Sequence, residues 1–312
     1  MTDIVTAQAE LFGRLDPLLP PIIELPPGEV VTAGLPDGRQ VHGSIYRALH
    51  GPDSVESLWE PRVVWEFTPL LGDTGRVGMA AALAAFRSWI DREVPASDFT
   101  HADTAAQVRW PSRDVEVAPA LRKHGFVPMT AFAVRSRLSD TDSAPPRADV
   151  VVRTASTADL EELLALELAE LQYSVNVGGG VVRDNAVDLL VAPLKRGLKF
   201  GGRVLVAEVG GVAVGAASCG WAAPVPGSSI DRLLPDGRWG YVGTLSVTPA
   251  ARGSGIGRTL MAAAHRELTI EGVHGTYLYY DIANPLSSVF WPRQGYRPLW
   301  TKWTARPAAT FR

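Results

Sequence analysis

The stretch from Leu245 to Arg258 concentrates residue types that can bind an anion. An apolar run ending at Val247 leads through Arg252-Gly253-Ser254-Gly255-Ile256-Gly257-Arg258 into a helical pattern. The first turn of a helix has unpaired N–H groups and partial positive charge, and glycines let the backbone approach a bulky anion. With an arginine at each end, this turn is predicted to hold a pyrophosphate. The alternative is that the glycines only permit a tight strand-to-helix turn.

Two other glycine-loop motifs fit this segment less well. A P-loop requires Gly-Lys followed by Ser or Thr, but the residue five positions after Gly253 is Arg258, and no lysine follows it. The dinucleotide fingerprint Gly-x-Gly-x-x-Gly would need a glycine at the same position. The turn is therefore predicted to serve a different phosphate-bearing ligand.

The C-terminal half alternates strands with helices around this turn. Apolar and turn patterns predict strands at 150–153, 203–208, 212–221, 239–247 and 277–282, and helices at 157–171, 184–194, 256–270 and 287–293. The N-terminal half has a weaker version, with strands at 29–34, 40–48, 63–67 and 107–110 and a helix at 78–90. This order indicates an α/β (α+β) fold in which a mixed, mostly antiparallel twisted sheet is flanked by helices.

Two short matches suggest that the halves are copies of each other. Phe67-Thr68-Pro69 stands eight residues before Gly75, as Val247-Thr248-Pro249 stands eight before Gly255. Further along, Gly125-Phe126-Val127-Pro128 corresponds to Gly295-Tyr296-Arg297-Pro298. Since both matches occur in the same order, we expect a duplicated domain, with one copy at 1–140, a polar linker at 141–148 and a second copy at 149–312.

Composition excludes several classes of function. Hydrophobic residues make up 46% of 312 residues, and 30 Lys+Arg against 33 Asp+Glu give a net charge of −3. We therefore expect a folded protein without a basic surface for nucleic acid or membrane. The single cysteine, Cys219, and six histidines without metal-ligand spacing predict no metal site. No signal peptide pattern is present, and a cytoplasmic monomer or homodimer is expected.

In this context the C-terminal half resembles the GNAT superfamily of N-acyltransferases. The resemblance lies in Arg252-x-x-Gly255-x-Gly257 after a strand ending Leu245-Ser246-Val247-x-Pro249, then in Asn284 and in Phe290-Trp291-x-x-x-Gly295-Tyr296. It covers roughly residues 150–303, and the tandem organisation is similar to that of mycothiol synthase.

The resemblance implies that acetyl-CoA (acyl-CoA) is the co-substrate and that the turn binds its pyrophosphate. The strand ending at Val247 would diverge from the strand at 277–282, and the pantetheine would pair with the backbone of Leu245 and Val247. A backbone N–H near Leu245 would stabilise the oxyanion. Asn284 would bind pantetheine or position the thiol; capping the following helix is its alternative role, and both can hold.

The sequence departs from the family pattern at the acid and base. Trp291 occupies the position where many relatives have a tyrosine that protonates the thiolate, and the strand 239–247 has no carboxylate. Asp281 is our first candidate for the base, followed by Glu208 and Tyr280. The alternative for Asp281 is a solvated residue at the end of a strand.

Two functions remain open from the sequence. The first is an N-acetyltransferase that acts on an amine acceptor, carried by a small molecule, by direct attack without a covalent enzyme intermediate. The second is a non-catalytic acyl-CoA sensor, which the missing tyrosine and strand carboxylate favour. The N-terminal copy has Gly72 in place of the arginine and Asp73 beside it, so only the C-terminal copy is expected to bind CoA.

Overall fold

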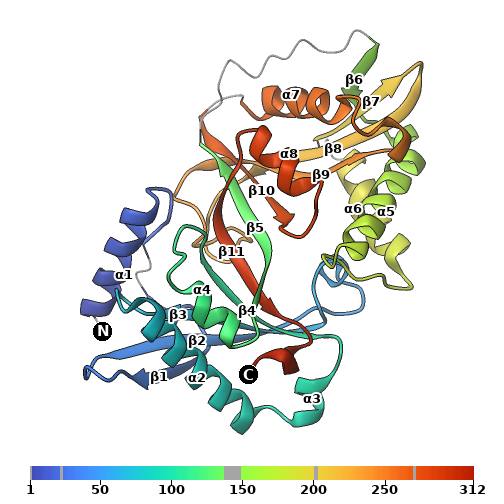
Figure 1. Ribbon diagram of the computed structural model, residues 1–312. Coiled ribbons are helices and arrows are strands. Elements are labelled where there is room, and N and C mark those ends of the chain that lie inside the picture. Colours follow the sequence, from blue (N-terminus) through green and yellow to red (C-terminus); the bar gives the residue numbers. More distant parts are fainter. Residues whose placement is uncertain (1, 22–23, 137–148, 200–202, 270–271) are drawn as a thin grey trace.

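Eleven strands form one continuous sheet along the molecule in the computed structural model, which describes residues 2–21, 24–136, 149–199, 203–269 and 272–312 (Figure 1). The strands are β1 (Glu29–Gly34), β2 (Gln40–Leu49), β3 (Val63–Leu70), β4 (Thr104–Pro111), β5 (Val127–Arg135), β6 (Val150–Thr154), β7 (Arg203–Val209), β8 (Val212–Ala222), β9 (Arg238–Val247), β10 (Val273–Asp281) and β11 (Arg297–Ala305). The helices are α1 (Thr2–Leu15), α2 (Gly75–Glu93), α3 (Ala96–Thr100), α4 (Ala118–Lys123), α5 (Leu160–Asn176), α6 (Ala186–Lys199), α7 (Ile256–Leu268) and α8 (Ser287–Arg293). Short 3₁₀ turns are η1 (Val55–Leu58), η3 (Thr157–Asp159), η4 (Pro249–Ala251) and η5 (Ala308–Thr310).

The two halves of the chain exchange their last strands. The order across the sheet is β1-β2-β3-β4-β11-β5-β10-β9-β8-β7-β6, so β11 pairs with β4 of the N-terminal half and β5 pairs with β10 of the C-terminal half. The two exchanged strands also pair with each other. This joins the halves through main-chain hydrogen bonds as well as side-chain packing.

The same local structure occurs twice, as the sequence matches predicted. The pairs β3–β4 and β9–β10 are parallel, and each is connected through a long helix, α2 or α7. Gly75 and Gly255 stand at the starts of these helices with φ of 53° and 94°, and Gly125 and Gly295 follow α4 and α8 with φ of 88° and 82°. All four glycines adopt the left-handed conformation that other residues avoid, so the paired turns need glycine for the same reason.

The C-terminal half of the sheet lies between two helical layers, as the alternating burial of its strand residues shows. Ala207 and Ala217 belong to the hydrophobic cluster formed with α7, whereas their neighbours Val206 and Ala216 belong to the cluster formed with α5 and α6. Successive strand residues point to opposite faces, so this pattern means that α7 covers one face while α5 and α6 cover the other.

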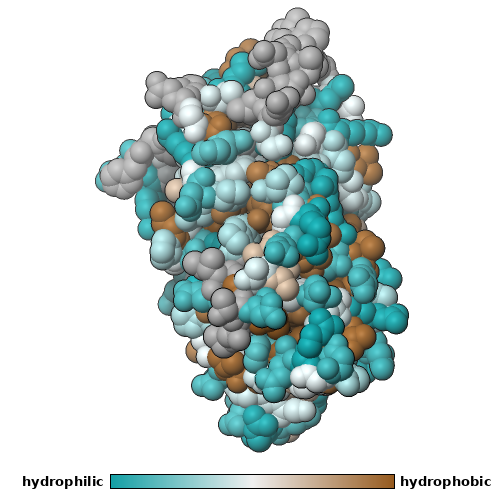
Figure 2. All heavy atoms as spheres, turned by 90° about the vertical axis from the view of Figure 1, so that its left-hand side faces the viewer, coloured by the Kyte–Doolittle hydropathy of each residue, from teal (hydrophilic) through white to brown (hydrophobic). Residues whose placement is uncertain are grey.

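In the N-terminal half the helices bury large aromatic residues. Phe67 of β3 stacks on Phe86 of α2 at 4.8 Å, and Phe126 and Phe311 complete this cluster. The face that carries α1 has scattered hydrophobic residues among hydrophilic ones rather than one apolar area (Figure 2). The apolar side of α1 is therefore turned inward.

The predicted strands and helices are confirmed, with shifts of a few residues at their ends. Ser156 caps the start of the first C-terminal helix through a capping box with Asp159. The sequence analysis missed α1, α3, α4, β5 and β11. The predicted linker at 141–148 lies outside the described residues, so the domain boundaries stay a prediction.

Candidate active site

The central strand of the C-terminal half, β9, contains a bulge that turns its main chain. Ala217 of β8 pairs with Leu245 and Cys219 pairs with Val242, so Gly243 and Thr244 together oppose Ser218. The Thr244 N–H donates to Ser218 Oγ at 2.8 Å. Val242 and Leu245 consequently face the same hydrophobic cluster although three positions separate them.

Beyond the bulge β9 parts from β10 and leaves a wedge between the strands. Their parallel pairing ends at Tyr241 with Tyr277, and the rest of β10, Leu278–Asp281, pairs only with β5 among its described neighbours. The predicted divergence of the two strands is therefore confirmed. The edge of β9 after Val242 is open to an extended ligand.

The main-chain groups of Leu245 and Val247 point into this wedge. The Thr248 N–H donates to Val214 O of β8 at 2.9 Å, so residue 248 faces β8. Because main-chain groups alternate between the two edges of a strand, those of residues 247 and 245 face the other edge. Arg252 Nε donates to Val247 O at 3.1 Å from that side, which agrees with this direction.

The glycine-bearing turn ends the wedge at the N-terminus of α7. Gly253 and Gly255 have φ of 78° and 94°, and the first helical bond runs from Thr259 N–H to Gly255 O. The N–H groups of Ile256, Gly257 and Arg258 thus belong to the open first turn. A Cβ at Gly257 would lie 3.4 Å from Phe290, an ordinary contact.

Arg252 packs against helix α5, and Ser254 is hydrogen-bonded within the turn. The Arg252 guanidinium lies 5.1 Å from the Tyr173 ring centroid of α5, and Ser254 Oγ donates to Ala251 O at 2.6 Å. Arg252, Gly253, Ser254 and Arg258 are all exposed. The predicted residues from 252 to 258 therefore form one positively charged turn whose polar side chains are exposed, while Ile256 is buried in the core under α7.

Asn284 is buried at the start of α8. Its Oδ1 accepts hydrogen bonds from the N–H groups of Leu286 and Ser287 at 2.9 and 3.1 Å. The capping role is thereby confirmed.

Trp291, which stands where many GNAT relatives have a tyrosine, belongs to the hydrophobic core. Trp291 is 6% exposed and packs edge-on against Phe290 and Tyr296. Tyr280 is half-buried on the same cluster, and burial raises the pKa of its phenol. At neutral pH this group keeps its proton, which makes Tyr280 unsuitable as a base.

Asp281 ends β10 in a polar contact region shared by both halves. Thr130 Oγ1 donates to its Oδ1 at 3.2 Å, and a Cβ at Gly179 would overlap its Oδ2. Burial raises the pKa of Asp281 to about 6; Lys302 opposes this shift and Glu60 adds to it. Lys302 and Glu60 form an ion pair with each other.

Two carboxylates that the sequence analysis missed lie on α5, near Asp281. Burial and the adjacent Glu170 raise the pKa of Glu167 to about 7. Burial raises the pKa of Glu170 as well, with Asp281 adding to the shift and Arg252 opposing it, and Ser174 Oγ donates to Glu170 at 2.9 Å. Three carboxyl groups with raised pKa values thus lie near the diverging strands, an arrangement typical of functional sites.

Glu167 and Glu170 line a cavity of about 300 Å³. It is bounded by α5, α6, β7, β8 and the β9 bulge at Thr244, and Val55 and Trp59 of the N-terminal half complete its wall. A signal for these carboxylates exists in the sequence: 167 and 170 fall on the helical face shared by the buried residues Leu163 and Ser174. Carboxylates are rarely buried without a partner, so their place in this stripe points to a functional role.

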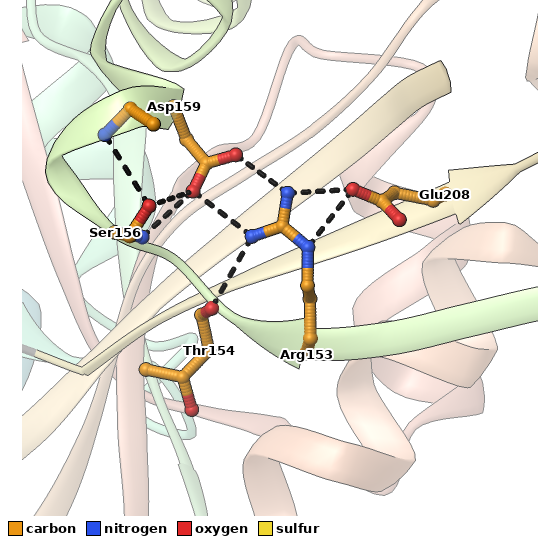
Figure 3. Close-up of polar contacts among 6 residues, drawn as sticks. Arg153, Thr154, Ser156, Asp159 and Glu208 are labelled. Carbon is orange, nitrogen blue, oxygen red and sulfur yellow. Dashed lines mark hydrogen bonds and ion pairs between the residues drawn. The ribbon is translucent and has the colours of Figure 1, made fainter. Parts of the chain in front are cut away.

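Glu208, the second candidate base, forms an ion pair with Arg153 away from the cavity. Arg153 donates to Glu208 Oε1 through Nε at 2.9 Å and through Nη2 at 2.5 Å, and the same guanidinium binds Asp159 (Figure 3). Glu208 lies near the β7–β8 hairpin, paired with Ala213, and does not line the cavity. The prediction of Glu208 as a reserve base is wrong, because its charge stabilises the start of α5.

In the N-terminal half, helix α1 fills the wedge that corresponds to this site. The β3–β4 pairing ends at Phe67 with Val108. Gln8, which is fully buried, donates from Nε2 to Pro69 O at 3.4 Å and accepts from Leu71 N–H at 2.5 Å and from Gly72 N–H at 3.2 Å.

The next turn of α1 closes the other side of this wedge. Phe12 contacts Trp110 of β4 and Trp300 of β11 edge-on at 5.5 and 5.6 Å. At the turn, Asp73 forms an ion pair with Arg39 at 2.8 Å, and a Cβ at Gly72 would lie 3.1 Å from Ile4. Trp65 and Phe67, which correspond to Leu245 and Val247, still pair with β4, and Gln8 binds the main chain that follows, so the main chain that would receive a ligand in this half is already paired.

Neither a metal site nor a membrane helix is found in the described part of the chain. No group of three or more His, Cys, Asp or Glu residues is arranged there to hold a metal ion. No helix among the described residues has the length and apolar character needed to cross a bilayer.

Comparison with known proteins finds a family match within the C-terminal half. Residues 180–298 match the acetyltransferase (GNAT) domain family. A GCN5-related N-acetyltransferase from Sphaerobacter thermophilus has the same fold over 89% of this chain and 81% of its own, with a TM-score of 0.55 and 15% identity. A functionally unknown conserved protein from Staphylococcus epidermidis covers 83% of this chain and 89% of its own, with a TM-score of 0.50 and 13% identity.

A smaller structure resembles only part of the chain. A predicted acetyltransferase from Clostridium acetobutylicum, solved with acetyl-CoA, covers 45% of this chain and 86% of its own, with a TM-score of 0.35 and 18% identity. No curated protein sequence matches this chain significantly.

Proposed function

Because the C-terminal half of this chain is a GNAT acetyltransferase domain, we propose that the protein transfers an acetyl group from acetyl-CoA to an amine of a small molecule, by direct attack in a ternary complex. The observation that carries this proposal is the open wedge between β9 and β10, which ends on the glycine-bearing N-terminus of α7. An extended thioester with a pyrophosphate at one end matches both features.

The pyrophosphate of acetyl-CoA binds the turn from Arg252 to Arg258. The N–H groups at the start of α7 donate to it, and Arg252 and Arg258 supply positive charge. Gly253, Ser254, Gly255, Ile256 and Gly257 contribute their backbone to this cradle.

The pantetheine pairs with the main chain of Leu245 and Val247 along the open edge of β9. Arg252 already occupies Val247 O, so the N–H of that residue is the group offered to the ligand. Asn284 has its Oδ1 engaged in the cap of α8 and offers its Nδ2 as a donor to the pantetheine or thiol.

The transfer needs a base for one proton and a donor for one oxyanion. The amine nitrogen attacks the thioester carbonyl carbon and forms the C–N bond while the carbonyl oxygen becomes negative. A main-chain N–H near Leu245, where the bulge turns the strand, stabilises that charge. Collapse breaks the C–S bond, and the CoA thiolate leaves without a protein acid and takes a proton from solvent.

We assign the removal of the proton from the amine to Asp281, which acts as the base together with Glu170. A carboxyl with a pKa of about 6 is a stronger base than an ordinary aspartate and is still largely ionised at neutral pH. Glu170 interacts electrostatically with Asp281, so the two titrate as a pair.

One acetyl-CoA binds per chain. In the N-terminal half Gln8 and Phe12 occupy the corresponding wedge, so that half acts as a scaffold for the C-terminal site.

The test is acceptor-dependent release of CoA thiol from acetyl-CoA across a panel of primary amines. We expect release with amines and acetylated product in equal amount, and loss of release in Asp281→Asn. Binding of acetyl-CoA without release for any amine would contradict the transfer and favour an acyl-CoA sensor.

A further inference from the structure

The cavity beside the β9 bulge is built by both halves of the chain. Glu167, Glu170 and Leu190 line it from the C-terminal half, and Val55 and Trp59 line it from the segment 54–61 of the N-terminal half. Thr244 places it next to the bulge where the thioester is expected. Its position and volume suit an acceptor molecule of small size.

The C-terminal half holds the segment 54–61 firmly in place. Leu58 is fully buried in a cluster with Leu171, Leu189 and Leu190. Val181 N–H donates to Leu58 O at 2.8 Å. Trp59 is therefore fixed next to α5 and α6 although it comes from the other copy.

An arginine adds a second connection between the halves. Arg183 Nε donates to Ser57 O at 3.0 Å, and its Nη1 and Nη2 bind the Asp103 carboxylate at 2.7 and 3.0 Å. This bidentate pair is largely buried, with 12% and 19% side-chain exposure. The position of Trp59 thus does not depend on a single contact.

The cavity combines an aromatic face with two carboxylates, and its one lining cation among the described residues, Arg203, is paired with Glu267. Trp59 is 36% exposed, so part of its indole is available to a ligand. In the described part of the chain no cationic side chain forms an ion pair with Glu167, whose charge is opposed by burial and by Glu170. A bound cation would relieve that repulsion.

We propose that Trp59 determines acceptor specificity, and that the acceptor is a primary amine on an apolar stem, with the stem packed on Trp59 and Leu190 and the ammonium group facing Glu167 and Glu170. This inference rests on the proposed acetyl transfer and deepens it by naming the acceptor class. It also gives the N-terminal half a direct part in the reaction, as one wall of the acceptor site.

The chemistry of the cavity lining explains why amines with apolar stems are preferred. An indole attracts alkyl chains and ammonium groups, whereas a polar stem would lose its hydration against Trp59 and Leu190 without new hydrogen bonds. The carboxylates lie near the bulge, so the nitrogen approaches the thioester from the acidic side of the cavity. The bound ammonium first gives one proton to Glu167 or Glu170, and the neutral amine then attacks and loses its second proton to Asp281.

The experiment compares Trp59→Ala and Trp59→Phe with Trp89→Ala, a control that removes a half-buried tryptophan of α2 in the same half. The probes are hexylamine, phenethylamine, ethanolamine, 2-(2-aminoethoxy)ethanol with its polar stem, and a short peptide with one lysine. Calorimetry measures amine and acetyl-CoA binding, and thiol release gives kcat and KM.

We expect Trp59→Ala to weaken binding of hexylamine and phenethylamine roughly tenfold and to raise their KM in proportion, with acetyl-CoA affinity unchanged. Trp59→Phe should restore most of the preference for apolar stems, and Trp89→Ala should behave like the parent. The peptide separates free amines from protein-borne lysines, and stronger binding of the free amines is expected.

Equal binding of all five probes by the parent and Trp59→Ala would overturn the inference, and so would better binding of ethanolamine than of hexylamine. Failure of the proposed transfer looks different: apolar amines still bind through Trp59 while no CoA is released. If Trp59→Ala does not fold, the Trp59→Phe comparison and the stem preference of the parent decide the question.

Discussion

Replacing Glu167 with glutamine should stabilise the protein at neutral pH. Burial and Glu170 raise the pKa of this carboxyl from 4.5 to about 7, so the folded protein resists its ionisation. A glutamine side chain at this position would keep a similar shape without the charge. The same substitution should impair recognition of the acceptor, because the cavity loses half of its acidic lining.

The direction of the pH effect on stability follows from the pKa values of Glu167 in the unfolded chain and in the folded protein. Below pH 4.5 the carboxyl is protonated in both states and contributes nothing to the pH dependence. As pH rises from 4.5 to about 7 the unfolded chain releases the proton while the folded protein retains it, so stability falls through this window. Above about pH 7 the full penalty applies.

The magnitude is set by the shift of about 2.5 pKa units from 4.5 to about 7. At about 1.4 kcal/mol per unit this gives an upper limit of about 3.5 kcal/mol for the gain above pH 7. Relief of the repulsion on Glu170 acts in the same direction.

The assay is urea unfolding at pH 5 and pH 8 for the parent, Glu167→Gln and Glu162→Gln, an exposed position on the same helix. We expect the gain for Glu167→Gln at pH 8 to exceed that at pH 5, and no comparable gain for Glu162→Gln. A destabilised Glu167→Gln at pH 8, or equal gains at both pH values, would refute the reasoning.

Three further predictions concern the base and the N-terminal wedge. Gly179→Ala would place Cβ against Asp281 Oδ2, so kcat should fall by roughly 100-fold, whereas Gly220→Ala has free space and should keep the parent rate; equal rates would contradict this. The kcat/KM of the parent should rise with pH and level off above about 6 as Asp281 loses its proton, and an unchanged profile in Asp281→Asn would remove this residue as the base. Gln8→Ala leaves buried main-chain groups unpaired and should lower the free energy of unfolding by about 1–3 kcal/mol in urea titration without changing acetyl-CoA affinity; a matching loss of affinity would be inconsistent with a purely structural Gln8.

Local patterns in the sequence predict the glycine-bearing turn before α7 and its flanking elements well. Glycines at 253 and 255 are required by their positive φ, and the strand and helix around them have clear apolar periods. Such signals lie within a few residues of each other, so a single sequence contains them.

The bulge in β9 and the exchange of β5 and β11 could not be predicted in the same way. Gly243 and Thr244 together oppose Ser218, so β9 has one extra residue there, and its position depends on the pairing with β8. The place of β11 between β4 and β5 likewise depends on pairing across more than 160 residues of chain.

The acidic cavity shows an error of interpretation rather than a missing signal. Glu167 and Glu170 fall on α5 between the buried residues Leu163 and Ser174, and this spacing marks them as residues of the buried face. Asp281 was found because it ends a strand in a recognised order, whereas Glu208 was ranked without its partner Arg153 on β6. A partner that pairs across strands becomes visible only in the fold.

Calorimetric titration with acetyl-CoA tests the central claim most directly. We predict one site per chain in the parent and in Asp73→Asn, which removes the acidic residue from the corresponding N-terminal turn. Arg252→Glu and Gly255→Asp should bind roughly 100-fold more weakly while remaining folded. Two sites per chain, or parental affinity in both C-terminal variants, would contradict the account.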